Sequence, residues 1–517
     1  MRNKQSFVRG TVILTISAFI TRMLGFVNSI VMARYLGPEG IGLMMIAQPL
    51  VPIIVTLTSL GLPVAISKLV AEAEVRDDQA KVKRILTVSL TITGSISIVL
   101  TLFSFFGAKL MSAWILSDPR AYYAMLAIIP IAPLVAVSSV IKGYFGGKQQ
   151  MSPLAVSDVV EQVIRIALIA ALVQYLLPFG IEYAAAGAMI STVIGEGAGL
   201  LYLMLMLQIH RRKRERQSFS PRWREEKKTL VELLEIGLPT TGQGFIHSIY
   251  RALQPLIITK SMAIAGISAV VATKQYGLLA GYTFPLLVFP SFIMHSLSTA
   301  LIPAISEAKA QGNGQLIHQR LDQAIRIALI IGAPCTAVLY VWAFPLTTAV
   351  YHMEQAGEFL KLLAPIFLLQ YFEPPLHAVL IGLGLVNTVM KNFIATTIVK
   401  AIAIFALGSI MGIHGIIWGM NIGICLITML NFLSLSKSIG FTLDIRTWFK
   451  VALSLAAMVL IGHHAFVWMQ DAGYTLLLSV IGSISVALLA YIVSLLATNT
   501  VKRNDVQRFP VIRKMFT

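Results

Sequence analysis

Residues 61–73, GLPVAISKLVAEA, have an imperfect second copy at residues 300–312, ALIPAISEAKAQG. Each copy places a proline shortly before Ala-Ile-Ser and continues into a charged, helix-favouring stretch. Each copy also ends an apolar run long enough to cross a bilayer, which takes about 20 residues. A motif that recurs at equivalent points of two membrane-spanning blocks indicates an internal repeat, a common feature of transporters.

The composition agrees with a membrane protein. Of 517 residues, 57% are hydrophobic and only 12% are charged, whereas soluble proteins carry about 25% charged residues. The apolar runs are too long and uniform for the alternating strands of a barrel, so we expect an all-α polytopic membrane protein of about fourteen helices. The predicted spans are 11–33, 41–64, 86–108, 121–141, 154–177, 183–207, 234–258, 278–303, 324–349, 359–382, 388–411, 413–435, 449–469 and 474–497.

The net charge of +18 follows membrane topology rather than a nucleic-acid surface. Of 41 Lys and Arg residues, 31 lie at the termini and in alternate gaps between spans, and five lie in the opposite gaps. Cytoplasmic loops carry such an excess of Lys and Arg. We therefore expect a multi-pass protein of the cytoplasmic membrane with both termini in the cytoplasm, in contact with membrane lipids and not with nucleic acid.

The repeat divides the predicted spans into two bundles. Residues 1–209 form an N-terminal bundle of six helices, and residues 230–436 form a second one. Between them, residues 210–229, HRRKRERQSFSPRWREEKKT, are a basic cytoplasmic linker. Residues 437–517 add two helices and a basic tail without a counterpart in the repeat.

Several ionisable residues fall inside the spans, where a charge is expensive unless it faces a partner or a wet cavity. Arg22, Arg251 and Lys400 come from both halves of the repeat and have no acidic residue one helical turn away. If they converge, they form a central cavity that suits an anion such as phosphate or pyrophosphate.

Two acidic positions leave alternatives open. Glu161 and Arg165 share one helix face, so they are either a structural pair or part of a substrate path. Glu196 is either a structural residue or part of the cavity wall, and the sequence favours neither.

No signature of catalysis, cofactor binding or metal binding is visible. The stretch GYFGGKQQ (143–150) lacks the glycine spacing and the Ser or Thr of a phosphate-binding loop. The cysteines, Cys335 and Cys425, lie inside apolar runs, and no His or Cys set has metal-ligand spacing. We expect a transporter without a cofactor rather than an enzyme.

Five stretches together resemble one family: 21–43 (TRMLGFVNSIVMARYLGPEGIGL), 61–73, 141–166 (IKGYFGGKQQMSPLAVSDVVEQVIRI), 180–191 and 296–308. The chain is similar to sporulation-specific members of the polysaccharide transport family, which belongs to the multidrug/oligosaccharidyl-lipid/polysaccharide superfamily and is related to lipid II flippases.

That resemblance implies a fold and a cargo. Two pseudo-symmetric six-helix bundles would form a V around a central cavity, with two further C-terminal helices. The cargo would be a lipid-linked peptidoglycan precursor, an undecaprenyl-pyrophosphate-linked sugar, used for the spore cortex. Arg22 matches a basic cavity residue of the lipid II flippases, whereas the next such position is Asn28 here.

The sequence therefore predicts a lipid-linked oligosaccharide flippase that works by alternating access. Two alternatives stay open. One is a cation-coupled multidrug exporter of the same superfamily, with Glu196 or Glu373 as the coupling acid. The other is a membrane scaffold that binds cortex synthesis enzymes and transports nothing.

Overall fold

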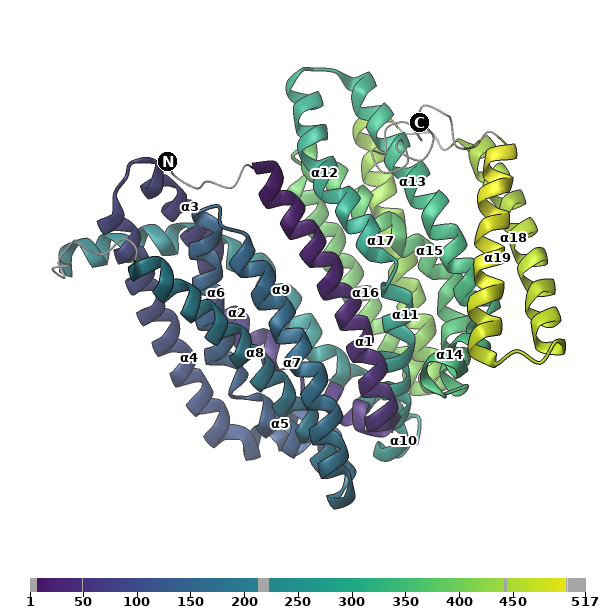
Figure 1. Cartoon of the computed structure of the whole chain (residues 1–517), viewed down its shortest axis with the longest axis horizontal. Coiled ribbons are helices and arrows are strands. Elements are labelled where there is room, and N and C mark those ends of the chain that lie inside the picture. Colours follow the sequence, from purple (N-terminus) through teal and green to yellow (C-terminus); the bar gives the residue numbers. More distant parts are fainter. Residues whose placement is uncertain (1–6, 49, 213–222, 441–443, 499, 501–517) are drawn as a thin grey trace. The chain divides into compact units, whose positions relative to one another are not determined.

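The structure is a computed structural model that describes residues 7–48, 50–212, 223–440, 444–498 and 500. These residues form helices joined by short turns, with no β-strand in the described ranges (Figure 1). The prediction of an all-α chain is confirmed. The chain folds as two compact units, Met1–Gly281 and Tyr282–Thr517.

The helices of the two units follow one another along the chain and are joined by a π-helical segment, η3 (Leu278–Thr283). The first unit contains α1 (Phe7–Ala47), α2 (Leu50–Ser59), α3 (Leu62–Val75), α4 (Gln79–Ile115), η1 (Pro119–Ala121), α5 (Tyr122–Ile128), α6 (Ile131–Gly147), α7 (Ser152–Leu176), η2 (Leu177–Phe179), α8 (Ile181–Arg212), α9 (Trp223–Ile264) and α10 (Ala269–Gly277). The second unit contains α11 (Phe284–Val288), α12 (Ser291–Ala310), α13 (Gly314–Val341), α14 (Ala343–Tyr351), α15 (Gln355–Gly382), α16 (Val386–Met411), α17 (Ile413–Ile439), α18 (Ile445–Asp471) and α19 (Leu476–Ala497).

The first predicted span ends close to a break in the structure. The apolar run 11–33 is followed by a kink at Gly37, which divides α1 into two helices, and the second of these ends at Ala47. The backbone of Gly37 has φ 69° and ψ 173°, a conformation that glycine adopts without steric cost. Pro38 follows, and its fixed φ suits the restart of a helix.

The predicted second span, 41–64, is not one helix, and this prediction was wrong. It is divided among the last turns of α1, the whole of α2 and the start of α3. The break before α3 lies at Leu60 and Gly61, whose φ values of 46° and 63° place both residues in the left-handed region. Hydrophobicity alone does not reveal a turn between two apolar helices, because the turn residues here are as apolar as their neighbours.

Both copies of the repeated motif are helical and face the interior of their own unit. The first copy is α3, which has Pro63 in its first turn, and the second is the end of α12, where Pro303 lies inside the helix. The equivalent isoleucines, Ile66 and Ile305, are both fully buried.

The core of the first unit surrounds α3 and takes apolar side chains from α3, α4, α6, α8 and α9. Gly147 of α6 permits close packing, because a Cβ atom there would overlap the backbone oxygen of Ser67 and the side chain of Val70. Leu233 of α9 is fully buried in the same core. The helix α9 is therefore an integral part of the first unit.

Two ion pairs hold the start of α9 against the start of α4. Lys81 Nζ lies 2.8 Å from Glu232 Oε2, and Arg84 pairs with Glu225. The sequence places α9 in the second bundle, 230–436, whereas its contacts lie in the first compact unit. The division into six-helix bundles at residues 1–209 and 230–436 stays a prediction.

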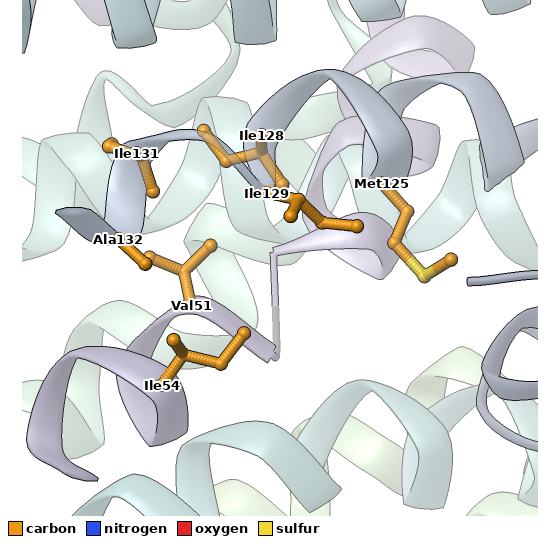
Figure 2. A pocket seen from close by; sticks show the side chains of 7 residues that line it. All are labelled: Val51, Ile54, Met125, Ile128, Ile129, Ile131 and Ala132. Carbon is orange, nitrogen blue, oxygen red and sulfur yellow. The ribbon is translucent and has the colours of Figure 1, made fainter. Parts of the chain in front are cut away.

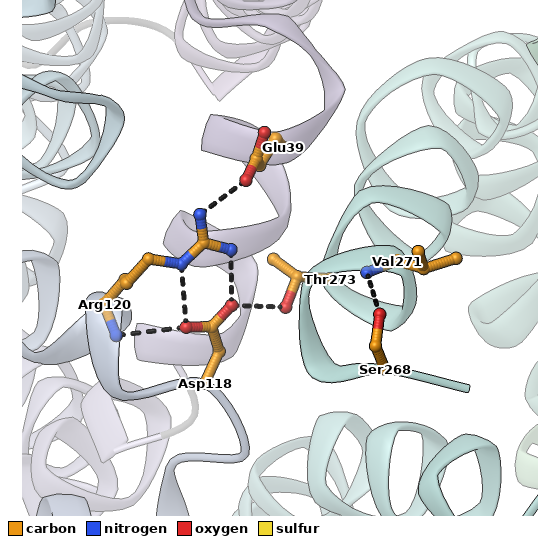
Figure 3. A network of polar contacts seen from close by, with 6 residues as sticks. All are labelled: Glu39, Asp118, Arg120, Ser268, Val271 and Thr273. Carbon is orange, nitrogen blue, oxygen red and sulfur yellow. Dashed lines mark hydrogen bonds and ion pairs between the residues drawn. The ribbon is translucent and has the colours of Figure 1, made fainter. Parts of the chain in front are cut away.

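A buried acidic residue ties η1 to two other helices of the first unit (Figure 3). Asp118 accepts hydrogen bonds from Arg120 Nη2 at 2.8 Å and from Thr273 Oγ1 of α10 at 3.0 Å. Arg120 Nη1 also donates to Glu39 Oε1 of α1 at 2.5 Å. Helices α1 and α10 approach each other closely at this point. A Cβ atom at Gly42 of α1 would overlap the backbone oxygen of Thr273 on α10, so the glycine permits the contact.

The second unit is built around α15, which packs against α12, α13 and α17. Tyr371 of α15 donates its hydroxyl proton to the backbone oxygen of Leu287 at 2.8 Å. The two C-terminal helices pack on each other and are fixed to α13 and the α13–α14 junction by two polar contacts of α19. Trp342 Nε1 donates to Ser483 Oγ at 3.0 Å, and Tyr491 donates to the backbone oxygen of Ile330 at 3.1 Å.

Within the described residues, nine helical segments are long and apolar enough to cross a membrane. A tenth is gained if Ala269–Val288 and Ser291–Ala310, which meet at 53°, count as one span. The segment Ile16–Val75 has 60 residues; it contains the predicted span 41–64 and overlaps most of the predicted span 11–33. The multi-pass character is clear, and the number of fourteen crossings stays a prediction.

Asp118 gives the first unit a stability that depends on pH. Burial alone would raise the pKa of this carboxyl, but the hydrogen bonds from Arg120 and Thr273 lower it below its usual value. A carboxyl with a depressed folded-state pKa stabilises the fold above its unfolded pKa of about 3.9, and this contribution is lost as the pH falls through the folded value.

We expect the melting temperature of the purified protein to fall as the pH drops below about 4. Asp118→Asn removes the titrating group, so the variant should melt lower at pH 7 and lose part of that acid dependence. Thermal melts between pH 7 and pH 3 measure both effects. Identical acid slopes in wild type and variant would contradict the assignment.

Candidate substrate site and a buried charge cluster

Two predicted site residues, Arg22 on α1 and Arg251 on α9, lie in the first unit with exposed side chains. Neither makes an ion pair or a hydrogen bond with another residue in the described part of the chain. An arginine at membrane depth without an acidic partner is expensive unless it meets water or an anionic ligand. Both therefore keep the properties expected of an anion-binding residue.

The helices that carry these arginines are held in place by polar contacts. Ser17 of α1 donates its hydroxyl proton to the backbone oxygen of Ala155 on α7 at 3.1 Å. Ser248 of α9 shares a 2.6 Å hydrogen bond with Thr56 of α2. Each arginine thus projects from a helix that is anchored within the first unit.

The predicted pair on α7 is formed. Arg165 Nη2 donates to Glu161 Oε1, and only 16% and 13% of the two side chains are exposed. The pair neutralises both charges within one helix, which favours the structural reading of these residues.

Two glycines of α8 bring that helix against the pair. A Cβ atom at Gly195 would lie 3.0 Å from the backbone oxygen of Glu161, and one at Gly199 would lie 3.3 Å from Glu161 Cβ. Gly195 and Gly199 are spaced as in the GxxxG pattern, which lets helices approach closely in a membrane. The third predicted site residue of this region, Glu196, lies between them.

Glu196 is buried, with 8% of its surface exposed. Its carboxyl is close enough to Ser138 of α6, and to Glu161, Arg165 and Lys142, to interact electrostatically with each of them. The structure therefore brings Glu161, Arg165 and Glu196 together, as members of one charge cluster on α6, α7 and α8.

Two further members of this cluster, Lys142 and Asp158, are not predicted from the sequence. Lys142 Nζ, near the end of α6, lies 2.7 Å from Asp158 Oδ1 on α7. Lys142 falls at the edge of a predicted loop, and Asp158 falls at the start of a predicted span. Their 16-residue separation spans a turn between two helices, so no helical spacing signals the pair.

Lys400 lies in the second unit, on α16, and its side chain is half-buried. Its methylene groups cover Gly423 of α17, where a Cβ atom would overlap them. The predicted convergence of Lys400 with Arg22 and Arg251 stays a prediction, because they belong to different units.

A small pocket of the first unit has no polar wall (Figure 2). It is lined by Val51, Ile54, Met125, Ile128, Ile129, Ile131 and Ala132. These side chains offer nothing that binds a charged headgroup.

A family model for polysaccharide biosynthesis proteins matches residues 7–309, and a second model, MatE, matches residues 279–406. Stage V sporulation protein B of Bacillus subtilis (strain 168) is 43% identical over 516 residues, which is 99% of each chain. The chain belongs to the polysaccharide biosynthesis protein family.

This member of the family is a homologue of stage V sporulation protein B and is also related to lipid II flippases. Lipid II flippase MurJ of Bacillus subtilis (strain 168) is 24% identical over 473 residues, 86% of each chain. A solved structure of lipid II flippase MurJ in an inward closed conformation has a TM-score of 0.66 at 14% identity, and it covers 95% of this chain and 100% of that chain. The family member is a multi-pass membrane protein with a MurJ-like fold.

The Glu161–Arg165 pair yields a stability prediction. Removal of one partner of a buried pair leaves an uncompensated charge and costs about 3 kcal/mol. Glu161→Gln should therefore lower the melting temperature in detergent, and the double variant Glu161→Gln/Arg165→Gln should recover much of the loss. Glu235→Gln, an exposed change on α9, is the matched control. Additive losses in the double variant would show that the pair is not coupled.

Proposed function

We propose that this family member is a flippase for a lipid-linked peptidoglycan or oligosaccharide precursor of the lipid II type. It would move an undecaprenyl-pyrophosphate-linked sugar across the cytoplasmic membrane for synthesis of the spore cortex. The relationship to stage V sporulation protein B and to lipid II flippases supports this cargo.

The observation that carries the proposal is that Arg22 and Arg251 are exposed without an acidic partner among the described residues. Guanidinium groups bind phosphate oxygens through two parallel hydrogen bonds. A pyrophosphate headgroup would be a negatively charged partner for these two side chains, while the polyprenyl tail stays in the bilayer.

The rest of the predicted architecture belongs to the same proposal. About fourteen helices would form two six-helix bundles in a V and two extra helices, with both termini in the cytoplasm. Lys400 would add a cation from the second bundle, and Glu161, Arg165 and Glu196 would form the polar wall behind the cargo. Cortex synthesis enzymes would receive the cargo on the outer side.

The membrane potential favours this direction of transport. Each negative charge that leaves a negative interior gains about 2.3 kcal/mol per 100 mV. An anionic headgroup that moves outward while the two bundles alternate can therefore use the potential itself as the driving force.

The test is transbilayer movement of labelled lipid II in proteoliposomes that contain the purified chain. Arg22→Ala and Arg251→Ala should each slow the movement at least tenfold, because each removes a charge-assisted contact of about 1.5–3 kcal/mol. Arg22→Lys should keep part of the rate, since it retains the charge and loses the bidentate geometry.

Two exposed cations on the same helices serve as matched controls, Arg34→Ala on α1 and Lys260→Ala on α9. Both should leave the rate near that of wild type. Normal movement in Arg22→Ala and Arg251→Ala would remove these residues from the site, and no movement of lipid II by wild type would refute the cargo.

A second candidate is cation-coupled export of an amphipathic compound. It is favoured by the match of the MatE model to residues 279–406, which include Glu373 on α15. In that case the double variant Glu196→Gln/Glu373→Gln should abolish drug efflux driven by an ion gradient. Efflux that survives the double substitution would exclude this function.

A further inference from the structure

The charge cluster of the first unit joins ionisable side chains from three packed helices. The helix α6 supplies Lys142, α7 supplies Asp158, Glu161 and Arg165, and α8 supplies Glu196. The helices α6 and α7 both pack against α8. The cluster lies wholly inside one compact unit.

Two of the three acids in this cluster have a cation bound to them. Asp158 accepts a hydrogen bond from Lys142 Nζ at 2.7 Å, and Glu161 pairs with Arg165. Glu196 has the hydroxyl of Ser138 nearby, and its charged neighbours are Glu161, Lys142 and Arg165. The two nearby cations are thus already engaged by other carboxylates.

The net charge of the cluster depends on how many of its five groups are ionised. Three carboxylates and two cations leave a net charge of −1 if all five groups are ionised. An uncompensated charge is expensive in a helical bundle at membrane depth. Glu196 is the most buried of the three acids: 8% of this residue is exposed, whereas Glu161 and Asp158 are half-buried. Its carboxyl is the place where neutralisation relieves the largest desolvation cost.

A metal ion does not fit the requirement as well as a proton. No group of three or more His, Cys, Asp or Glu residues among those that the structure describes is arranged to hold a metal ion. A proton needs one carboxyl only, and Ser138 can accept the hydrogen bond that a protonated carboxyl donates.

We propose that the first unit contains a proton-binding site, in which the Glu196 carboxyl holds one proton at neutral pH and thereby balances the charge of the cluster. The site depends on the cluster alone and not on the identity of the cargo.

Lys142 provides a route for proton exchange. It interacts with Asp158, Glu196 and Glu161, and 29% of its side chain is exposed. When the ammonium moves from Asp158 to Glu196, the Glu196 carboxyl releases its proton to water and becomes a carboxylate paired with Lys142. The Asp158 carboxylate is then hydrated, which its exposure permits. The net charge changes by one proton, so the site can couple a conformational change to proton movement.

The test is infrared spectroscopy of the full-length protein in detergent at neutral pH, without any cargo. A protonated carboxyl has a carbonyl stretching band that is distinct from carboxylate bands and shifts in D₂O. The wild-type spectrum minus that of Glu196→Gln should contain one such band. The control Glu235→Gln, an exposed acid on α9, should give no band in the same subtraction.

A second pair of variants tests the charge balance without changing Glu196. Asp158→Asn leaves two acids and two cations, so Glu196 should ionise and the same band should disappear. Lys142→Gln increases the negative excess, so the band should persist. Because Asp158 is the most exposed acid of the cluster, Asp158→Asn remains informative if Glu196→Gln does not fold.

The proposal is overturned if Glu196→Gln removes no band, or if Asp158→Asn retains it in full. The absence of cargo keeps this result separate from the lipid II experiment. A band without lipid II movement refutes the flippase only, and movement without a band refutes the proton site only.

Discussion

A charge at the centre of a bilayer costs roughly 2.5–3.5 kcal/mol or more, and the polar groups of the first unit are arranged around this cost. Glu161 and Lys142 each meet an opposite charge, on Arg165 and Asp158. Arg22 and Arg251 do not, and both reach the surface of the unit. The same constraint therefore separates two kinds of residue: those neutralised inside the bundle and those left available to an anionic ligand.

Close helix packing makes the neutralised group possible. Gly195 and Gly199 let α8 approach α7 at the level of the Glu161–Arg165 pair, and this approach brings Glu196 into the cluster. A Cβ atom at Gly195 would lie 3.0 Å from the backbone oxygen of Glu161, and one at Gly199 would lie 3.2 Å from Ser157 Oγ, so a larger residue at either position fits only if α7 gives way slightly. The glycines shorten the distance between α7 and α8. Electrostatic interactions between charged side chains on the two helices are stronger at the shorter separation.

The other end of the unit follows a related principle. Asp118 is buried, and it is stabilised by Arg120 and by Thr273 of α10 rather than left alone. Gly42 of α1 permits the contact between α1 and α10 that places Thr273 there. This network explains why α10 belongs to the first unit, although the sequence repeat groups it with the second bundle.

Local patterns in the sequence are enough to predict the membrane class, the helical fold and the Glu161–Arg165 pair. Each depends on local spacing: apolar runs of span length, and two charges one turn apart on one helix. Local spacing also predicts Arg22 and Arg251 as candidate anion-binding residues, because the sequence shows that no acidic residue lies one helical turn away from either.

The folded chain adds three features that no local pattern reveals. They are the interruption of the second span at Leu60 and Gly61, the pairing of Lys142 with Asp158, and the position of Glu196 on α8 close to the Glu161–Arg165 pair of α7. These features depend on how far apart two helices lie and how one is rotated against the other. Apolar patterning sets which residues enter the membrane, but many packings bury the same apolar surface. Contacts between helices are therefore fixed by the complementary shapes of side chains and glycines, and those shapes meet only in the folded chain.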